Sequence, residues 1–316
     1  DNGAVSCWGY AYSGQLGNGG STQTNTPGQT SSLGAGRTAV AISSGSEHTC
    51  VILDNGAVSC WGAGSKGQLG NGATSNKNTP TPTSSLGTGR TAVAISSGNQ
   101  HTCVILDDGT VSCWGENGDG RLGDGTTGNR NTPTQTSSLG TGRTAVAISS
   151  GGYHTCAILD DGSVSCWGGG THGQLGNGGT SNKNTPTLTS SLGTGRTAIA
   201  LSSGGLHTCV ILDNGAVSCW GEGYNGRLGN GGTSNKNTPT LTSSLGTGRT
   251  AVAISSGGQH TCAILDDGSV SCWGDNSDVQ LGDGTNTDRN TPTQTSSLGT
   301  GRTAVAISSG SSHTCA

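Results

Sequence analysis

The stretch HTCVILDNGAVSCWG, residues 48–62, has the pattern of a β-hairpin that carries one cysteine on each strand. Its Asp-Asn-Gly centre fits a three-residue loop, in which glycine takes the left-handed conformation that other residues avoid. This loop places Ile52 opposite Val58 and Cys50 opposite Cys60. Directly opposed cysteines in an antiparallel pair are close enough for a disulfide. The run Val-Ile-Leu lacks polar alternation, which predicts that both faces of the hairpin are covered.

The hairpin recurs six times with a period of 53 residues. One full unit, residues 142–194, reads GRTAVAISSGGYHTCAILDDGSVSCWGGGTHGQLGNGGTSNKNTPTLTSSLGT. The sequence of each repeat predicts four short strands, of the types TAVAISS, HTCVIL, AVSCWG and TPTLTSSL. Four-stranded antiparallel sheets that repeat and cover one another predict an all-β fold, a six-bladed β-propeller. We expect it to form a single domain over residues 1–316.

All twelve cysteines have a hairpin partner in this scheme. Joining Ala316 to Asp1 would rebuild the hairpin except for two apolar residues, as if a six-repeat circle were cut inside one hairpin. We therefore expect the N-terminal and C-terminal strands to pair and close the ring. The predicted disulfides are Cys7–Cys315, Cys50–Cys60, Cys103–Cys113, Cys156–Cys166, Cys209–Cys219 and Cys262–Cys272. Zinc is the competing interpretation, although one hairpin supplies only two thiolates. Paired cysteines indicate an oxidising compartment, so we expect an extracellular or cell-surface location. The sequence has no Met, so we expect a processed chain or an excised segment.

Composition and motifs disfavour several classes of function. The net charge is −4 and no run of Lys or Arg occurs, so binding to nucleic acid is not expected. No stretch approaches the ~18 apolar residues of a membrane span, so membrane insertion is not expected. The sequence contains neither a Gly-Lys dipeptide nor a His-Glu-x-x-His motif. We therefore expect no phosphate loop, catalytic residue or cofactor, and no enzyme.

The recurring motif GxxHTCAILDDGSVSCWGxxxxGQLGNG, followed by NTP, resembles the repeat of the regulator of chromosome condensation family. The resemblance covers the whole chain and implies a β-propeller. It does not imply one function, since the family includes a nucleotide exchange factor for a small GTPase, a plant ultraviolet receptor and a secreted bacterial inhibitor of β-lactamase. Most members have seven blades. The six repeats and the paired cysteines are departures, and the cysteines favour secreted prokaryotic members.

Two segments of each repeat differ among the copies, and we call them the variable segments. One precedes each His-Thr-Cys and the other follows each Trp-Gly. We expect both at one face, because the third strand ends opposite the start of the second. They contain all four Tyr, all three Glu and the one His outside His-Thr-Cys. The predicted binding residues are Tyr10, Tyr12, Glu47, Lys66, Glu116, Asp119, Tyr153, His172, Leu206, Glu222, Tyr224 and Asp275. Unrestrained drift of exposed loops is the alternative.

The constant part of the repeat also has candidate sites. The six His of His-Thr-Cys could form a metal-binding ring, but we expect each to bond backbone within its own blade. We expect the six Trp to pack between blades. Six Arg at the opposite face should pair with the Asp of the hairpin loops. The segments GDGTTGNRN and GDGTNTDRN, residues 123–131 and 282–290, weakly suggest calcium, although their carboxylate spacing fits no known loop. We therefore expect no metal site.

The leading hypothesis is a secreted, disulfide-stabilised β-propeller that binds a protein or a surface macromolecule through the variable segments. Tyr-rich and Asn-rich variation on a constant scaffold resembles the composition of a binding paratope. The alternative is a structural subunit or segment of an extracellular filament or surface assembly, with self-association of the chain.

Overall fold

The computed structural model describes residues 3–316, so Asp1 and Asn2 of the predicted domain lie outside the described residues. The chain forms two compact units. The first ends at Ser150 and also includes Lys183–Pro186, and the second comprises Gly151–Asn182 and Thr187–Ala316. Both consist of short strands, and no α-helix is present among residues 3–316.

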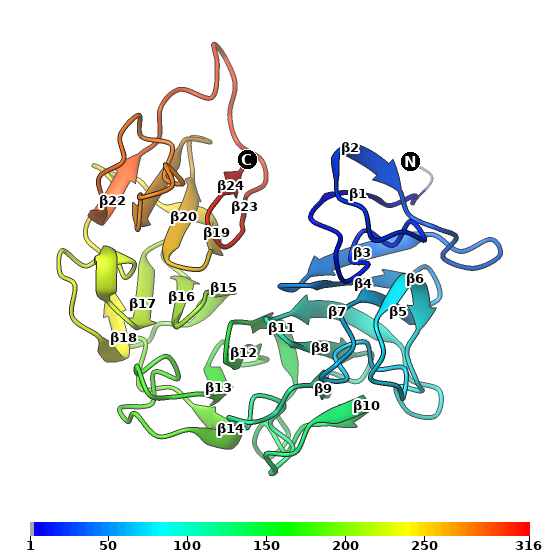
Figure 1. Cartoon of the computed structure of the whole chain (residues 1–316). Helices are drawn as coiled ribbons and strands as arrows, with labels where there is room; N and C mark the ends of the chain where they lie inside the picture. Colours follow the sequence, from blue (N-terminus) through cyan, green and yellow to red (C-terminus); the bar gives the residue numbers. More distant parts are fainter. Residues whose placement is uncertain (1–2) are drawn as a thin grey trace. The chain divides into compact units, whose positions relative to one another are not determined.

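The first unit contains two complete antiparallel sheets, ordered β3-β4-β5-β6 and β10-β9-β8-β7, and the two-stranded sheet β1-β2 (Figure 1). Each sheet order follows the chain, so every strand pairs with its neighbour in sequence. The strand bounds are β1 (Ser6–Gly9), β2 (Thr24–Gln29), β3 (Ala39–Ser44), β4 (His48–Leu53), β5 (Val58–Gly62), β6 (Lys77–Pro82), β7 (Ala92–Ser97), β8 (His101–Leu106), β9 (Val111–Gly115), β10 (Arg130–Gln135) and β11 (Ala145–Ser150).

The second unit repeats the same pattern. Its complete sheets are β15-β16-β17-β18 and β19-β20-β21-β22, and it also contains the hairpin β12–β13 and the two-stranded sheet β23-β24 (Figure 1). The bounds are β12 (His154–Leu159), β13 (Val164–Gly168), β14 (Lys183–Leu188, of which Lys183–Pro186 belong to the first unit), β15 (Ala198–Ser203), β16 (His207–Leu212), β17 (Val217–Gly221), the 3-10 turn η1 (Tyr224–Gly226), β18 (Lys236–Leu241), β19 (Ala251–Ser256), β20 (His260–Leu265), β21 (Val270–Gly274), β22 (Arg289–Gln294), β23 (Ser308–Ser309) and β24 (Thr314–Cys315).

The predicted hairpin register is confirmed. In β4–β5, Cys50 lies opposite Cys60 and Ile52 opposite Val58. The loop glycine, Gly56, has a φ of 74°, the left-handed conformation that the Asp-Asn-Gly loop requires. Every residue of β4 and β5 is buried, so both faces of the hairpin are covered, as the Val-Ile-Leu run predicts.

The prediction for the fourth strand of the repeat is only partly correct. The predicted TPTLTSSL of one repeat covers residues 185–192, whereas the strand observed there, β14, is Lys183–Leu188. The N–H of Thr189 still donates to the carbonyl of Val164 in β13 at 2.9 Å, and the chain leaves the sheet at Ser190. The backbone N–H of Ser190 donates to the carbonyl of Gly176 at 2.8 Å, and the Ser191 hydroxyl accepts the N–H of Gly193.

Five of the six predicted disulfides are present. Each joins the second and third strands of one repeat, with a Cα–Cα distance of 4.1 Å. The two remaining cysteines, Cys7 and Cys315, are free thiols. Cys7 lies in the sheet β1-β2 and Cys315 in the sheet β23-β24. Each of these sheets contains only half of a repeat, so neither supplies an opposed cysteine.

The Cys7–Cys315 bridge and the ring closure that it would lock remain proposals from the repeat register. We expect peptide mapping of the oxidised chain, without reductant, to yield a cross-linked peptide that contains both cysteines. The five internal bridges serve as positive controls in the same digest. Recovery of Cys7 and Cys315 as separately alkylated thiols would contradict the pairing.

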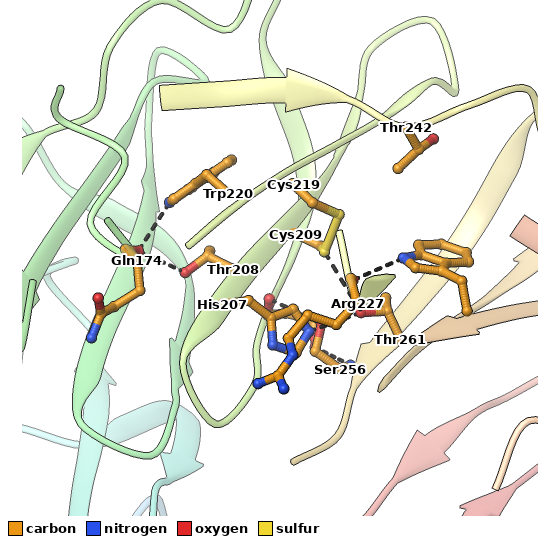
Figure 2. The surroundings of a disulfide bond; sticks show 12 residues. Gln174, His207, Thr208, Cys209, Cys219, Trp220, Arg227, Thr242, Ser256 and Thr261 are labelled. Atoms are coloured by element: carbon orange, nitrogen blue, oxygen red, sulfur yellow. Dashed lines mark hydrogen bonds between the residues drawn. A yellow bond between two sulfur atoms is a disulfide. The ribbon is translucent and has the colours of Figure 1, made fainter. Parts of the chain in front are cut away.

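The tryptophan of one repeat packs against the preceding repeat, as predicted. Trp114 is buried in a cluster with Ile52, Val58 and Leu69 of the preceding copy. Its indole N–H donates to the main-chain carbonyl of Gln68 at 2.9 Å. Figure 2 shows the equivalent bond from Trp220 to Gln174. Trp8 is the exception, since its side chain is exposed.

The histidines of His-Thr-Cys also join consecutive repeats. The expectation that each would bond backbone within its own blade was therefore wrong. The ring Nε2 of His48 lies 2.9 Å from the Thr102 hydroxyl, and that hydroxyl donates to the carbonyl of Gln68. Because the hydroxyl proton is used there, Nε2 must carry the proton that His48 donates. The unprotonated Nδ1 is buried without a partner. The ring is therefore a neutral connector, and burial lowers its pKa to about 4.

Candidate functional site

The two variable segments of one repeat lie side by side, as predicted. The backbone N–H that follows Trp-Gly donates to the carbonyl just before His-Thr-Cys. These bonds join Ala63 to Glu47 and Glu222 to Leu206, at 2.8 and 2.9 Å. They extend the ladder of the second and third strands by one pair. The strands thus fix the backbone from which both variable segments project.

All four tyrosines are exposed on these segments. The exposed fractions are 59% for Tyr10, 78% for Tyr12, 44% for Tyr153 and 63% for Tyr224. Tyr10 and Tyr12 stack, with ring centroids 6.5 Å apart. An exposed tyrosine offers apolar area and a hydroxyl group while having little conformational entropy to lose. The side chain of Leu206 is less exposed than these tyrosines, since it is half-buried.

In the first unit, a buried arginine joins two of the predicted residues. Arg121, with a side chain only 3% exposed, forms ion pairs with Asp119 at 2.6 Å and with Glu116 at 3.4 Å. Lys66 lies 3.8 Å from the same Glu116. Glu47 instead accepts a hydrogen bond from the Ser13 hydroxyl.

In the second unit, Arg227 has the same role. Its guanidinium donates to Glu222 at 2.5 Å and to the side chain of Gln259 at 2.9 Å. Its Nε donates to the main-chain carbonyl of Tyr224 at 3.0 Å. His172 lies 3.9 Å from Glu222. The guanidinium therefore fixes the backbone beneath the exposed Tyr224 ring.

Asp275 lies next to this network but is buried, unlike the other predicted binding residues. Its carboxylate accepts hydrogen bonds from Gln280, Ser277 and Asn225, at 2.6, 3.1 and 3.0 Å. This arrangement joins the variable segments of two consecutive repeats. Asp275 thus supports the shape of the surface and is not available on it.

Arg121 and Arg227 were not among the predicted site residues, although the sequence contains a signal for them. The motif Gly-Gln-Leu becomes Gly-Arg-Leu only in the two repeats whose first residue after Trp-Gly is Glu. Both pairs, Glu116 with Arg121 and Glu222 with Arg227, have the same spacing of five residues. Correlated changes of opposite charge indicate a contact.

The segments that weakly suggested calcium have another explanation. Asp124 accepts hydrogen bonds from Thr126, Arg130 and Asn117, and Asp283 has the same set in its repeat. Burial by itself would raise the pKa of Asp283, but hydrogen bonds from Thr285 and Arg289 outweigh it and lower the pKa to about 2. Both carboxylates are thus satisfied by protein donors.

At the opposite end of the hairpins, arginine–aspartate pairs of the predicted kind are present at Arg37, Arg90, Arg196 and Arg249. Arg37 contacts Asp54 at 3.3 Å, and Arg90 contacts Asp108 at 2.8 Å. These side chains are largely exposed, so each pair contributes about 0–1 kcal/mol. They connect the hairpin loop to the entry of the first strand.

Within residues 3–316, no cluster of three or more His, Cys, Asp or Glu side chains has a metal-binding arrangement. Over the same residues, no helix has the length and apolar character needed to cross a membrane.

The repeated four-stranded antiparallel sheets, with their inter-repeat tryptophans, define a β-propeller protein built from one kind of repeat. The family model described as the RCC1-like domain matches residues 1–316, and the chain belongs to this family. The resemblance inferred from the repeat motif is thereby confirmed.

Two curated relatives illustrate the range of proteins that contain this domain. The chain is 32% identical to the E3 ubiquitin-protein ligase HERC2 of Homo sapiens, over 100% of its own length and 6% of the relative. It is 32% identical to the ultraviolet-B receptor UVR8 of Arabidopsis thaliana, over 92% of its own length and 65% of the relative. The chain thus spans only a small part of HERC2.

Solved structures show the same fold. Human WBSCR16 matches 96% of this chain and 78% of its own, with a TM-score of 0.85 and 21% identity. Yeast RCC1 (Prp20), in its complex with Kap60, matches 99% of this chain and 76% of its own, with a TM-score of 0.85 and 18% identity. At these identities the likeness concerns the propeller fold alone.

Proposed function

We propose that this chain is a protein-binding β-propeller whose partner contacts the variable segments. The observation that carries the proposal is the confinement of every tyrosine to these segments, where all four rings are exposed. A constant framework with aromatic variation at its loops has the chemistry of a binding surface, since large aromatic side chains dominate binding energy. Yeast RCC1, a structural neighbour, was solved in complex with Kap60, which supports a binding role for this fold.

The buried arginines add a reason to favour binding over drift. Arg121 and Arg227 each order several variable-segment groups through charged hydrogen bonds. If the sequences of these loops varied without selection, buried arginines that hold their side chains in place would not be expected. Preorganised side chains lose less entropy on association, so they contribute more to affinity.

We also propose that the chain acts in an oxidising compartment, outside the cell or at its surface. Five disulfides within 53-residue repeats support this location, because cytosolic thiols are kept reduced. We propose a binding role without catalysis.

Replacing all four tyrosines by serine tests the function. We expect proteins captured from the extracellular fraction of the source organism by the unmodified chain to bind the variant at least about tenfold more weakly, because exposed tyrosines are typical hot spots. The melting temperature should change by less than about 2 °C, since exposed side chains contribute little to stability.

A variant at the opposite end, Arg37→Ala with Arg90→Ala, serves as the control and should retain the captured proteins. Equal capture by the tyrosine variant, or a loss of capture only in the arginine variant, would refute the assignment of the surface. Size-exclusion chromatography should show a monomer, and a polymer would instead support the assembly role.

A further inference from the structure

Within the second unit, the variable segment that contains η1 forms a pocket with the loop leading into β22. The pocket has a volume of about 320 Å³ and is lined by Tyr224, Asn225, Thr233, Asp288 and Asn290. The Tyr224 ring is exposed, and its backbone is fixed by Arg227. The pocket therefore combines a positioned aromatic ring with polar groups from the next repeat.

The polar groups around this pocket offer several free oxygen acceptors. The side-chain amide of Asn225 donates to Asp275, and that of Asn290 donates to the carbonyl of Gly231, both at 3.0 Å. Each amide oxygen is left as an acceptor. Asp288 uses Oδ1 to accept the N–H of Asn276 at 2.9 Å, which leaves Oδ2. The hydroxyls of Tyr224 and Thr233 and the second N–H of each asparagine amide can also donate.

The nearby cations do not neutralise this pocket. Arg227 is buried and its guanidinium contacts Glu222 and Gln259. Arg289 contacts Asp283 and Thr285. Among the described residues, Asp288 takes part in no ion pair. An acceptor-rich pocket with an uncompensated carboxylate and an aromatic ring favours a ligand that is cationic and rich in N–H donors.

We propose that this pocket binds an arginine side chain presented by the protein partner, an inference that rests on the proposed function and deepens it. The guanidinium has five N–H donors and no acceptor, so it matches the free oxygens of Asp288, Asn225 and Asn290. Its planar face stacks on an aromatic ring, an interaction that the compact ammonium of lysine lacks. A sugar hydroxyl fits less well, since it carries no positive charge to pair with the Asp288 carboxylate.

The chain contains its own comparison site. Tyr12 occupies the same position in the first repeat as Tyr224 in the fifth, four residues after the tryptophan. The residue that corresponds to Asp288 there is Asn76, whose Oδ1 accepts the N–H of Gly64. Asn129, Asn182 and Asn235 occupy this position in three other repeats. Asp288→Asn therefore restores the common residue and removes only the charge.

The test uses 3-fluorotyrosine, which gives one 19F resonance for each of the four tyrosines in the chain. The probe is N-acetyl-arginine amide, with the neutral isostere N-acetyl-citrulline amide and with N-acetyl-lysine amide as comparisons. We expect the arginine probe to shift the Tyr224 resonance saturably and to leave Tyr12 unshifted. Asp288→Asn should weaken this binding about tenfold, the typical effect of removing a charged hydrogen bond. The Tyr224→Phe variant assigns the resonance.

Three results would overturn the inference: no saturable shift at Tyr224, equal affinity in Asp288→Asn, or equal affinity for citrulline or lysine. The other three resonances show that each variant is folded. The measurement needs no partner, so its failure is distinct from failure of the proposed function. If the arginine probe does not bind but the tyrosine variant still loses its captured proteins, only the pocket assignment is wrong.

Discussion

We expect the free energy of unfolding to decrease steeply as the pH falls from about 6.5 to about 4. Burial lowers the pKa of His48 and of His260 to about 4, and it lowers the pKa of His207 well below its usual value. Between these pH values the unfolded chain binds protons that the folded chain does not, so stability is lost as the pH falls. A shift from 6.5 to about 4 corresponds to about 3 kcal/mol for each of His48 and His260.

The measurement is denaturant unfolding at a series of pH values, for the unmodified chain and for His48→Gln. The glutamine amide can still donate to Thr102 but binds no proton, so the variant should show a pH slope smaller by up to about one proton. Its stability at neutral pH should fall because the imidazole packing is lost. Asp283, with a pKa of about 2, acts in a separate window below pH 4. A stability that is constant between pH 6.5 and 4 would contradict the neutral, buried state of these rings.

The hairpin could be predicted because its determinants are local. The loop glycine, the two opposed cysteines and the period of 53 residues are all visible in sequence, and together they set the register of β4 and β5. The end of the fourth strand was missed because Ser190 leaves the sheet for a tertiary bond to Gly176. Nothing in the local sequence encodes that bond.

The partners of the candidate site were harder to predict for the same reason. His48 contacts Thr102, 54 residues along the chain, so a within-repeat partner was the wrong expectation. Exposed tyrosines could be located from their confinement to the variable segments. Arg227 was missed because the repeat motif treats its position as framework, whereas the side chain bonds to two variable residues, Glu222 and Gln259.

We expect Trp114→Ala to lower the free energy of unfolding by about 3–5 kcal/mol, the usual cost of deleting a large buried aromatic side chain. Trp114 is fully buried, and it fills a site made by Ile52, Val58 and Leu69 of the preceding repeat. The site is shaped by Gly70, where a Cβ atom would lie 2.7 Å from the indole nitrogen. Alanine leaves a cavity here, because a sheet fixed by the Cys50–Cys60 disulfide has little freedom to collapse into it.

Trp114→Phe separates packing from hydrogen bonding at this position. Phenylalanine keeps much of the apolar volume but cannot donate to the Gln68 carbonyl, which then retains only the Thr102 hydroxyl as a donor. We expect an intermediate loss, because one hydrogen bond contributes about 1 kcal/mol and part of the packing remains. Denaturant unfolding of the three proteins gives the comparison. An alanine variant as stable as the unmodified chain would mean that the indole does not join the repeats. Stability would then come from each disulfide-linked sheet separately, and the one-dimensional coupling expected of a repeat protein would be absent.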